Sequence, residues 1–134
     1  MLGAYQIPLF DKTLHFTSGI LISELALMLY NYLTDNKAHK TKKEQLLAIT
    51  FVFSFNMMIA VLWEFFEYWC LIFLKNDAIN HYTTGVHDSI TDMLVALIGG
   101  CIIIYYLIKY FKVNKDNFWT KLSKQFYQIN FNQE

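Results

Sequence analysis

Acidic and histidine side chains recur at helical spacing within apolar stretches of the sequence. They form three groups, which are Asp11 with His15, Glu64 with Glu67, and His87 with Asp88 and Asp92. Residues three or four apart lie on one face of a helix, so members at this spacing point the same way. Carboxylates and imidazoles are ligands that Zn²⁺, Mn²⁺ and Fe²⁺ accept. The pattern therefore predicts a divalent metal ion as cofactor, which would lower the pKa of bound water and supply a nucleophile.

These side chains divide into metal ligands and groups around them. The expected metal ligands are His15, Glu64, Glu67, His87 and Asp92. The candidate catalytic residues are Glu64, Glu67 and Asp88, and either Asp11 or Asp88 is expected to support the ligands or to act as general base. Glu24 is a further supporting candidate, about 13 Å deeper than His15 along the helix. The sequence leaves three alternatives open for Glu24: it faces a second subunit, it belongs to a deeper proton path, or it pairs with Asn56.

Glu64 and Glu67 carry the strongest functional signal. An ionisable group in the middle of a membrane helix costs at least ~2.5 kcal/mol on the insertion scale, so such groups usually mark function or pair with each other. Both lie toward the C-terminal end of their stretch, where the helix dipole disfavours negative charge. Asp11 and Asp88 stand at expected helix starts, where capping is an equally good explanation. For His15 and His87, the alternative to metal binding is that the imidazole lies at the membrane interface among the lipid headgroups.

Three stretches are long and apolar enough to position these groups across a membrane. Of the residues, 55% are hydrophobic and only 16% are charged, whereas soluble domains are nearer ~25% charged. A spanning helix needs roughly 20 apolar residues, and residues 14–33, 46–74 and 89–111 meet this requirement. Apolar residues at helical spacing predict an amphipathic interfacial helix over about residues 115–130. The predicted fold is an all-α polytopic membrane protein with three transmembrane helices in one membrane domain, residues 1–134.

The charges are segregated although the formal net charge is zero. Most cations occupy two places: Lys37, Lys40, Lys42 and Lys43, and then Lys109, Lys112, Lys115, Lys121 and Lys124. The positive-inside rule then places the first connection and the C-terminus in the cytoplasm, and the N-terminus and residues 75–88 outside. Membrane lipids are the expected partners, and the cytoplasmic (inner) membrane is the expected location. The absence of arginine and of a net basic face argues against nucleic-acid binding.

Small and aromatic residues accompany the acidic groups. Small or polar residues share helix faces with them, namely Gly19 and Ser23, Asn56 and Ala60, and Ala96 and Gly99. Small faces let membrane helices approach closely, so the polar stripes are expected to point into the bundle. Aromatic residues gather near the outer end, namely Trp63, Tyr68, Trp69 and Tyr82. They are expected to form an interfacial belt rather than a substrate platform.

Three motifs carry a resemblance to known families. They are Asp11-Lys12-x-x-His15-Phe16-x-x-Gly19, Trp63-Glu64-x-x-Glu67, and Gly85-x-x-Asp88-x-x-x-Asp92-Met93-x-x-Ala96-Leu97-Ile98-Gly99. Together they resemble the YjdF-like family of uncharacterised inner-membrane proteins. More distantly, the first and third motifs are similar to VanZ-like proteins, which are associated with glycopeptide tolerance. The resemblance implies a polar site shared by the three spans. Because YjdF-like members usually have additional spans, it also implies a homodimer that completes the site.

Several functions are compatible with this pattern. The first is a metal-dependent membrane enzyme that acts on a lipid-linked or envelope substrate at the outer leaflet, although the sequence has no HExxH or ExxH motif. The second is a proton- or cation-coupled transporter or sensor, which three helices could form only as an oligomer. The third is an accessory membrane protein in which the carboxylates fix helix packing. The sequence does not decide between an enzyme and the other two.

Overall fold

A computed structural model of the chain describes residues 9–37, 39, 41–77 and 80–131. Within these residues all regular structure is helical, in the order α1 (Phe10–Leu33), α2 (Lys42–Leu74), α3 (His81–Thr84), α4 (Val86–Val113) and α5 (Phe118–Phe131). The helices α1, α2 and α4 are long and apolar enough to cross a membrane. They confirm the three predicted spans, and each extends somewhat beyond its predicted bounds. The helix α5 confirms the predicted C-terminal helix, whereas the single turn of α3 was not expected.

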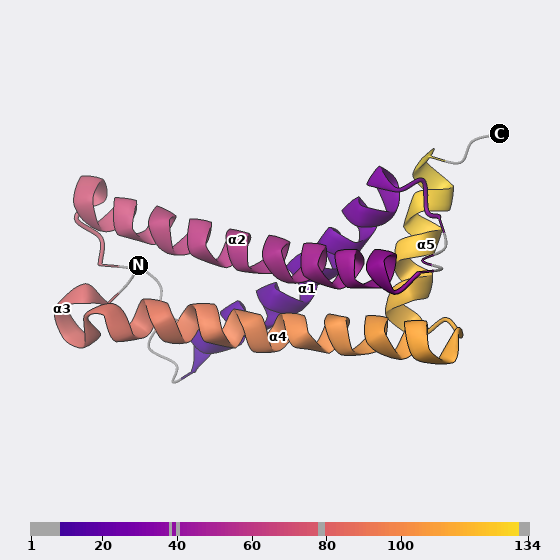
Figure 1. Cartoon of the computed structure of the whole chain (residues 1–134). Helices are drawn as coiled ribbons and strands as arrows, with labels where there is room; N and C mark the ends of the chain where they lie inside the picture. Colours follow the sequence, from indigo (N-terminus) through magenta and orange to yellow (C-terminus); the bar gives the residue numbers. More distant parts are fainter. Residues whose placement is uncertain (1–8, 38, 40, 78–79, 132–134) are drawn as a thin grey trace.

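The helix α1 is the centre of the bundle. Figure 1 shows α2 and α4 running in opposite directions, with α1 crossing them and α5 lying across the end where α1 stops and α2 begins. The helix α1 contacts α2, α4 and α5, and its contact with α4 is the most extensive. It therefore buries side chains on opposite sides, including His15 and Glu24. Since Glu24 is only 4% exposed, it does not face a second subunit.

Glycines allow α1 and α4 to cross at very short distance. A Cβ atom added at Gly19 would overlap the backbone of Ala96, and one added at Gly99 would overlap the backbone of Phe16. The two glycines lie on opposite helices, and at each contact the glycine is the partner that carries no side chain. The predicted close approach of small faces is thus confirmed for this pair of helices.

The helix α5 docks on the bundle through small polar side chains. Thr120 and Ser123 are buried, and Asn31 Nδ2 of α1 donates a hydrogen bond of 2.7 Å to Ser123 Oγ. The apolar residues that predicted this helix are exposed: Phe118, Leu122, Phe126 and Ile129. Of these, Phe126 also lines a pocket with residues of α1. An exposed apolar face suits a helix that lies in the membrane interface.

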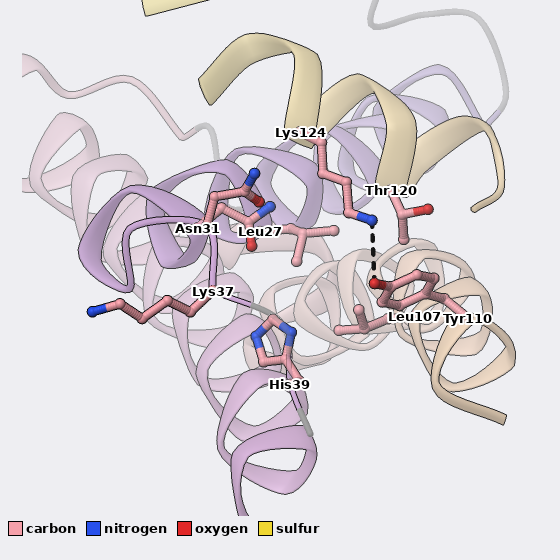
Figure 2. Close-up of a pocket in the computed structure, with 9 residues that line it drawn as sticks. Leu27, Asn31, Lys37, His39, Leu107, Tyr110, Thr120 and Lys124 are labelled. Carbon is pink, nitrogen blue, oxygen red and sulfur yellow. Dashed lines mark hydrogen bonds between the residues drawn. The ribbon is translucent and has the colours of Figure 1, made fainter. Parts of the chain in front are cut away.

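A cavity of about 190 Å³ lies beside this contact and is lined by residues of α1, the following connection, α4 and α5. Lys124 reaches from α5 toward Tyr110 and donates to its hydroxyl at 3.1 Å (Figure 2). On the other side of the cavity, His39 stacks on Tyr30 with ring centroids 5.2 Å apart, and it also contacts Phe111. Burial lowers the pKa of His39, Glu44 acts to raise it, and Lys124 lowers it further.

We expect Gly99→Ala to destabilise the bundle. The added methyl group would overlap the backbone of Phe16, so α1 and α4 must separate, at a cost of about 1–3 kcal/mol or more. Thermal unfolding in mild detergent measures this as a lower melting temperature. Ile98→Val removes a methyl group from the exposed face next to it and should change the melting temperature little. A Gly99→Ala melting temperature equal to that of the wild type would contradict the close crossing.

We expect acidification to weaken this end of the bundle through His39. Because its pKa is lowered from 6.5 in the folded protein, the unfolded chain takes up the proton first. The contribution of the neutral His39 to stability is therefore present above about pH 6.5 and is lost as the pH falls below that value. Melting temperatures at about pH 7.5 and about pH 5 measure the loss. The variant His39→Phe keeps the aromatic stacking, and its melting temperature should fall less between the two pH values than that of the wild type. An equal fall in both proteins would show that His39 does not contribute to the pH dependence.

Candidate functional site

One end of the bundle gathers buried polar side chains from all three spanning helices. His15 comes from α1, Glu64 and Glu67 from α2, and Asp92 from α4. None of these four side chains is more than 8% exposed. The faces that the spacing predicted for α1, α2 and α4 therefore meet at one place in the bundle.

Two overlapping groups in this cluster have a geometry that could hold a metal ion. One group is His15, Glu64 and Glu67, and the other is Asp11, His15 and Asp92. In each group, the possible ligand atoms lie within 4.8 Å of one another. Ligand atoms bound to one ion at 2.0–2.2 Å are at most about 4.4 Å apart. The side chains of either group would need to draw together only slightly to hold an ion.

Lys12 forms ion pairs with both acidic residues of α4. Its Nζ atom lies 2.7 Å from an oxygen of Asp88 and 2.7 Å from an oxygen of Asp92. Asp88 also accepts a hydrogen bond from Asn80. Because Asp92 already has a cation as partner, the group of His15, Glu64 and Glu67 is the better candidate for a metal ion. No local spacing connects residue 12 with residues 88 and 92, so the sequence offered no signal for this ion pair.

The two glutamates of α2 differ in their partners. Glu67 accepts a hydrogen bond of 2.9 Å from Trp63 Nε1. Ser89 of α4 lies near Glu64, but neither oxygen of Glu64 has a hydrogen-bond partner of normal geometry within the described residues. The aromatic pattern predicts Trp63 only as part of an interfacial belt, although its spacing of four residues from Glu67 also indicates this contact. Trp63 thus holds one of the two carboxylates in place.

Asp11 and Asp88 do not cap their helices. The N-cap of α1 is Leu9 and that of α4 is Gly85, and neither cap has a side-chain hydrogen bond. Asp11 instead places an oxygen 3.7 Å from His15 Nε2. A carboxylate hydrogen-bonded to a ligating imidazole orients the ring and raises its basicity; at 3.7 Å, Asp11 is slightly beyond hydrogen-bond distance and would have to move closer to take this role.

Two other predicted residues lie outside both groups. His87 is exposed at the start of α4, and it belongs to neither candidate metal group found in the described part of the chain. Glu24 is buried deeper in the bundle, and its two oxygens lack hydrogen-bond partners among the described residues. Asn56 Nδ2 donates to the backbone oxygen of Ala96. The pair between Glu24 and Asn56, one of the three surroundings that the sequence left open for Glu24, is therefore not formed.

Comparison with protein families gives one match. Residues 2–113 match the family described as "Predicted membrane protein (DUF2238)". This confirms the expected resemblance to an uncharacterised membrane family, while the YjdF-like and VanZ-like resemblances stay predictions. Comparison with curated proteins and with solved structures gives no match.

We expect Lys12→Met to destabilise the protein because it leaves Asp88 and Asp92 without their cation. Breaking a fully buried ion pair costs ~3–5 kcal/mol, and the loss here should be smaller because the Lys12 side chain is 26% exposed. Unfolding in mild detergent measures the difference in stability. Lys37→Met is the matched control, because Lys37 and its partner Asp35 are 78% and 70% exposed and such pairs contribute little. Equal stability of the two variants would contradict a structural role for Lys12.

Proposed function

The chain belongs to the predicted membrane protein family DUF2238, and we propose that this membrane protein holds a divalent metal ion between His15, Glu64 and Glu67. All three side chains come from one chain, so the proposal does not require the homodimer, which stays a prediction. An imidazole with two carboxylates suits Zn²⁺, Mn²⁺ or Fe²⁺. A site with three protein ligands leaves a further position for water or substrate.

The observation that carries this proposal is the environment of Glu64. Its side chain is 6% exposed, and although Ser89 lies near it, no described residue forms a hydrogen bond of normal geometry to either carboxylate oxygen. A buried carboxylate without a partner must be neutral or bound to a cation, because desolvation of an unpaired charge is very costly. The ligand atoms of His15 and Glu67 lie close to Glu64, and such neighbours favour the cation.

The charges of the chain support an orientation for this site. The lysines of the α1–α2 connection and of the segment after α4 favour the cytoplasm for that end of the bundle. The cluster of His15, Glu64 and Glu67 then lies in the outer half of the cytoplasmic membrane. A metal-bound water at that depth would be a nucleophile for a lipid-linked or envelope substrate. Glu64 and Glu67 would act as ligands of the reacting centre, and Asp11 would orient His15.

Glu24 favours a second candidate function. It is buried on the other side of α1, about 13 Å from His15 along the helix, and its oxygens have no hydrogen-bond partner in the part of the chain described. Ionisable groups at several depths are what a proton relay requires. A proton- or cation-coupled transporter or sensor is therefore the alternative, and measurements of pH or cation flux in proteoliposomes distinguish it from metal binding alone.

We expect the purified protein to contain about one divalent metal ion per chain, as the geometry of one three-ligand site implies. Purification in mild detergent without chelator, followed by elemental analysis, measures the content of Zn, Mn and Fe. Glu64→Gln and Glu67→Gln should each lose most of the metal and keep the helical circular dichroism spectrum. Added metal should raise the melting temperature of the wild type, because an ion that binds only the folded state stabilises it.

Glu24→Gln is the matched control for this experiment. Glu24 resembles Glu64 in its burial and in its lack of hydrogen-bond partners among the described residues, but it belongs to neither candidate metal group. It should therefore keep the metal content of the wild type. Wild-type protein without stoichiometric metal and without a response to added metal would overturn the proposal. So would a Glu64→Gln variant that keeps its full metal content.

A further inference from the structure

A cavity of about 440 Å³ lies between α1 and α2, directly beside the candidate metal site. His15 and Glu67 line one end of the cavity, and Ile22 and Asn56 line the other. Its volume falls within the ~300–1,000 Å³ that is typical of small-molecule sites. The candidate metal site is therefore continuous with a space large enough for part of a substrate.

The walls of the cavity are mostly apolar. Leu14, Ile22 and Ile59 contribute larger apolar side chains, whereas Gly19, Ala60 and Ala96 leave the space open because they are small. The few polar groups lie at the ends, apart from Ser18, which is exposed and lines the cavity from α1. An apolar lining with ionisable groups at only one end fits an amphiphile whose polar part lies at His15 and Glu67.

The length of the cavity matches one leaflet of a membrane. Seven residues separate His15 from Ile22 along α1, which corresponds to about 10 Å, and eleven residues separate Glu67 from Asn56 along α2, which corresponds to about 16 Å. Half of the ~30 Å hydrocarbon core of a bilayer is about 15 Å. One lipid hydrocarbon chain, extended from the site toward the middle of the membrane, would therefore fit along the cavity.

The charges at the polar end select the kind of headgroup. Acidic residues dominate this end of the bundle, since Lys12 is already shared between Asp88 and Asp92. Asp11 is 27% exposed and is the most distant acidic partner of Lys12, at 3.9 Å against 2.7 Å for Asp88 and Asp92, so it can accept a further cationic group from outside. A headgroup with net negative charge is disfavoured there, whereas a headgroup with an ammonium group is complementary to Asp11.

We propose that this cavity binds one acyl chain of a zwitterionic phospholipid with an amine headgroup, whose phosphodiester lies at His15 and Glu67. The ammonium group then pairs with Asp11. The position of the phosphodiester rests on the proposed metal function, because a metal ion at His15, Glu64 and Glu67 would bind its oxygen. The binding of the acyl chain rests on the cavity alone.

Native mass spectrometry of the full-length protein in mild detergent tests this proposal. Phosphatidylethanolamine and phosphatidylglycerol with the same acyl chains are added in turn, and retained lipid is counted. The wild type should retain phosphatidylethanolamine several-fold better than phosphatidylglycerol. Ser18→Leu should lose this retention because the larger side chain fills the cavity. Ser54→Leu makes the same change at an exposed position of α2 and should behave as the wild type.

Metal content measured on the same samples separates the two proposals. Ser18→Leu should keep its metal, and Glu64→Gln should lose its metal but still retain lipid through the acyl chain. The wild type could contain no metal and still retain lipid, with that retention lost in Ser18→Leu. This result would contradict the metal site and leave the cavity proposal intact. Equal retention by Ser18→Leu and Ser54→Leu would overturn the cavity proposal, as would a preference for phosphatidylglycerol. The same spectra show whether the wild type is a dimer. If Ser18→Leu dissociates a dimer and leaves the amount of retained lipid unchanged, the cavity proposal is also overturned, because a second copy of the chain would then fill the cavity.

Discussion

The burial of carboxylates within a membrane bundle is the constraint on which the arrangement of this protein depends. A charged carboxylate in such surroundings requires a cation close by. Lys12 supplies that cation for Asp88 and Asp92. Both Lys12 and His15 belong to α1, so the acids of α2 and α4 meet their basic partners only if α1 packs against both helices, as it does. The central position of α1 is therefore also an electrostatic requirement.

Close packing makes this electrostatic arrangement possible. Membrane helices gain little from the hydrophobic effect when they associate, and they depend on van der Waals contact and polar interactions. Gly19 and Gly99 bring the backbones of α1 and α4 together. The ion pairs of Lys12 lie about two helical turns from Gly19, near enough for this approach to hold Lys12 within 2.7 Å of both aspartates. The glycine crossing and the ion pairs therefore support each other.

The sequence predicts the elements of this protein well and the contacts between them only in part. Hydropathy and length predict spanning helices because a bilayer imposes a minimum length on each of them. Helical spacing predicts which face of α2 carries Glu64 and Glu67, because this face is a local property. The partners of Lys12 are 76 and 80 residues away, and only the packing of α1 against α4 determines them. For the same reason, the sequence could not show that His87 would be exposed while Glu24 would be buried.

The tight contact between α1 and α4 also explains the open space beside it. Gly19 and Ala96 belong both to the crossing of α1 with α4 and to the lining of the cavity between α1 and α2. Small residues draw α1 toward α4, and they provide no side-chain volume to fill the space that remains beside α2. Filling that space with larger side chains at these positions would push α1 away from α4 and lengthen the ion pairs of Lys12. The cavity is therefore a consequence of the same packing that pairs Lys12 with Asp88 and Asp92, and it lies beside Glu64, the carboxylate that this packing leaves without a hydrogen-bond partner of normal geometry in the described chain.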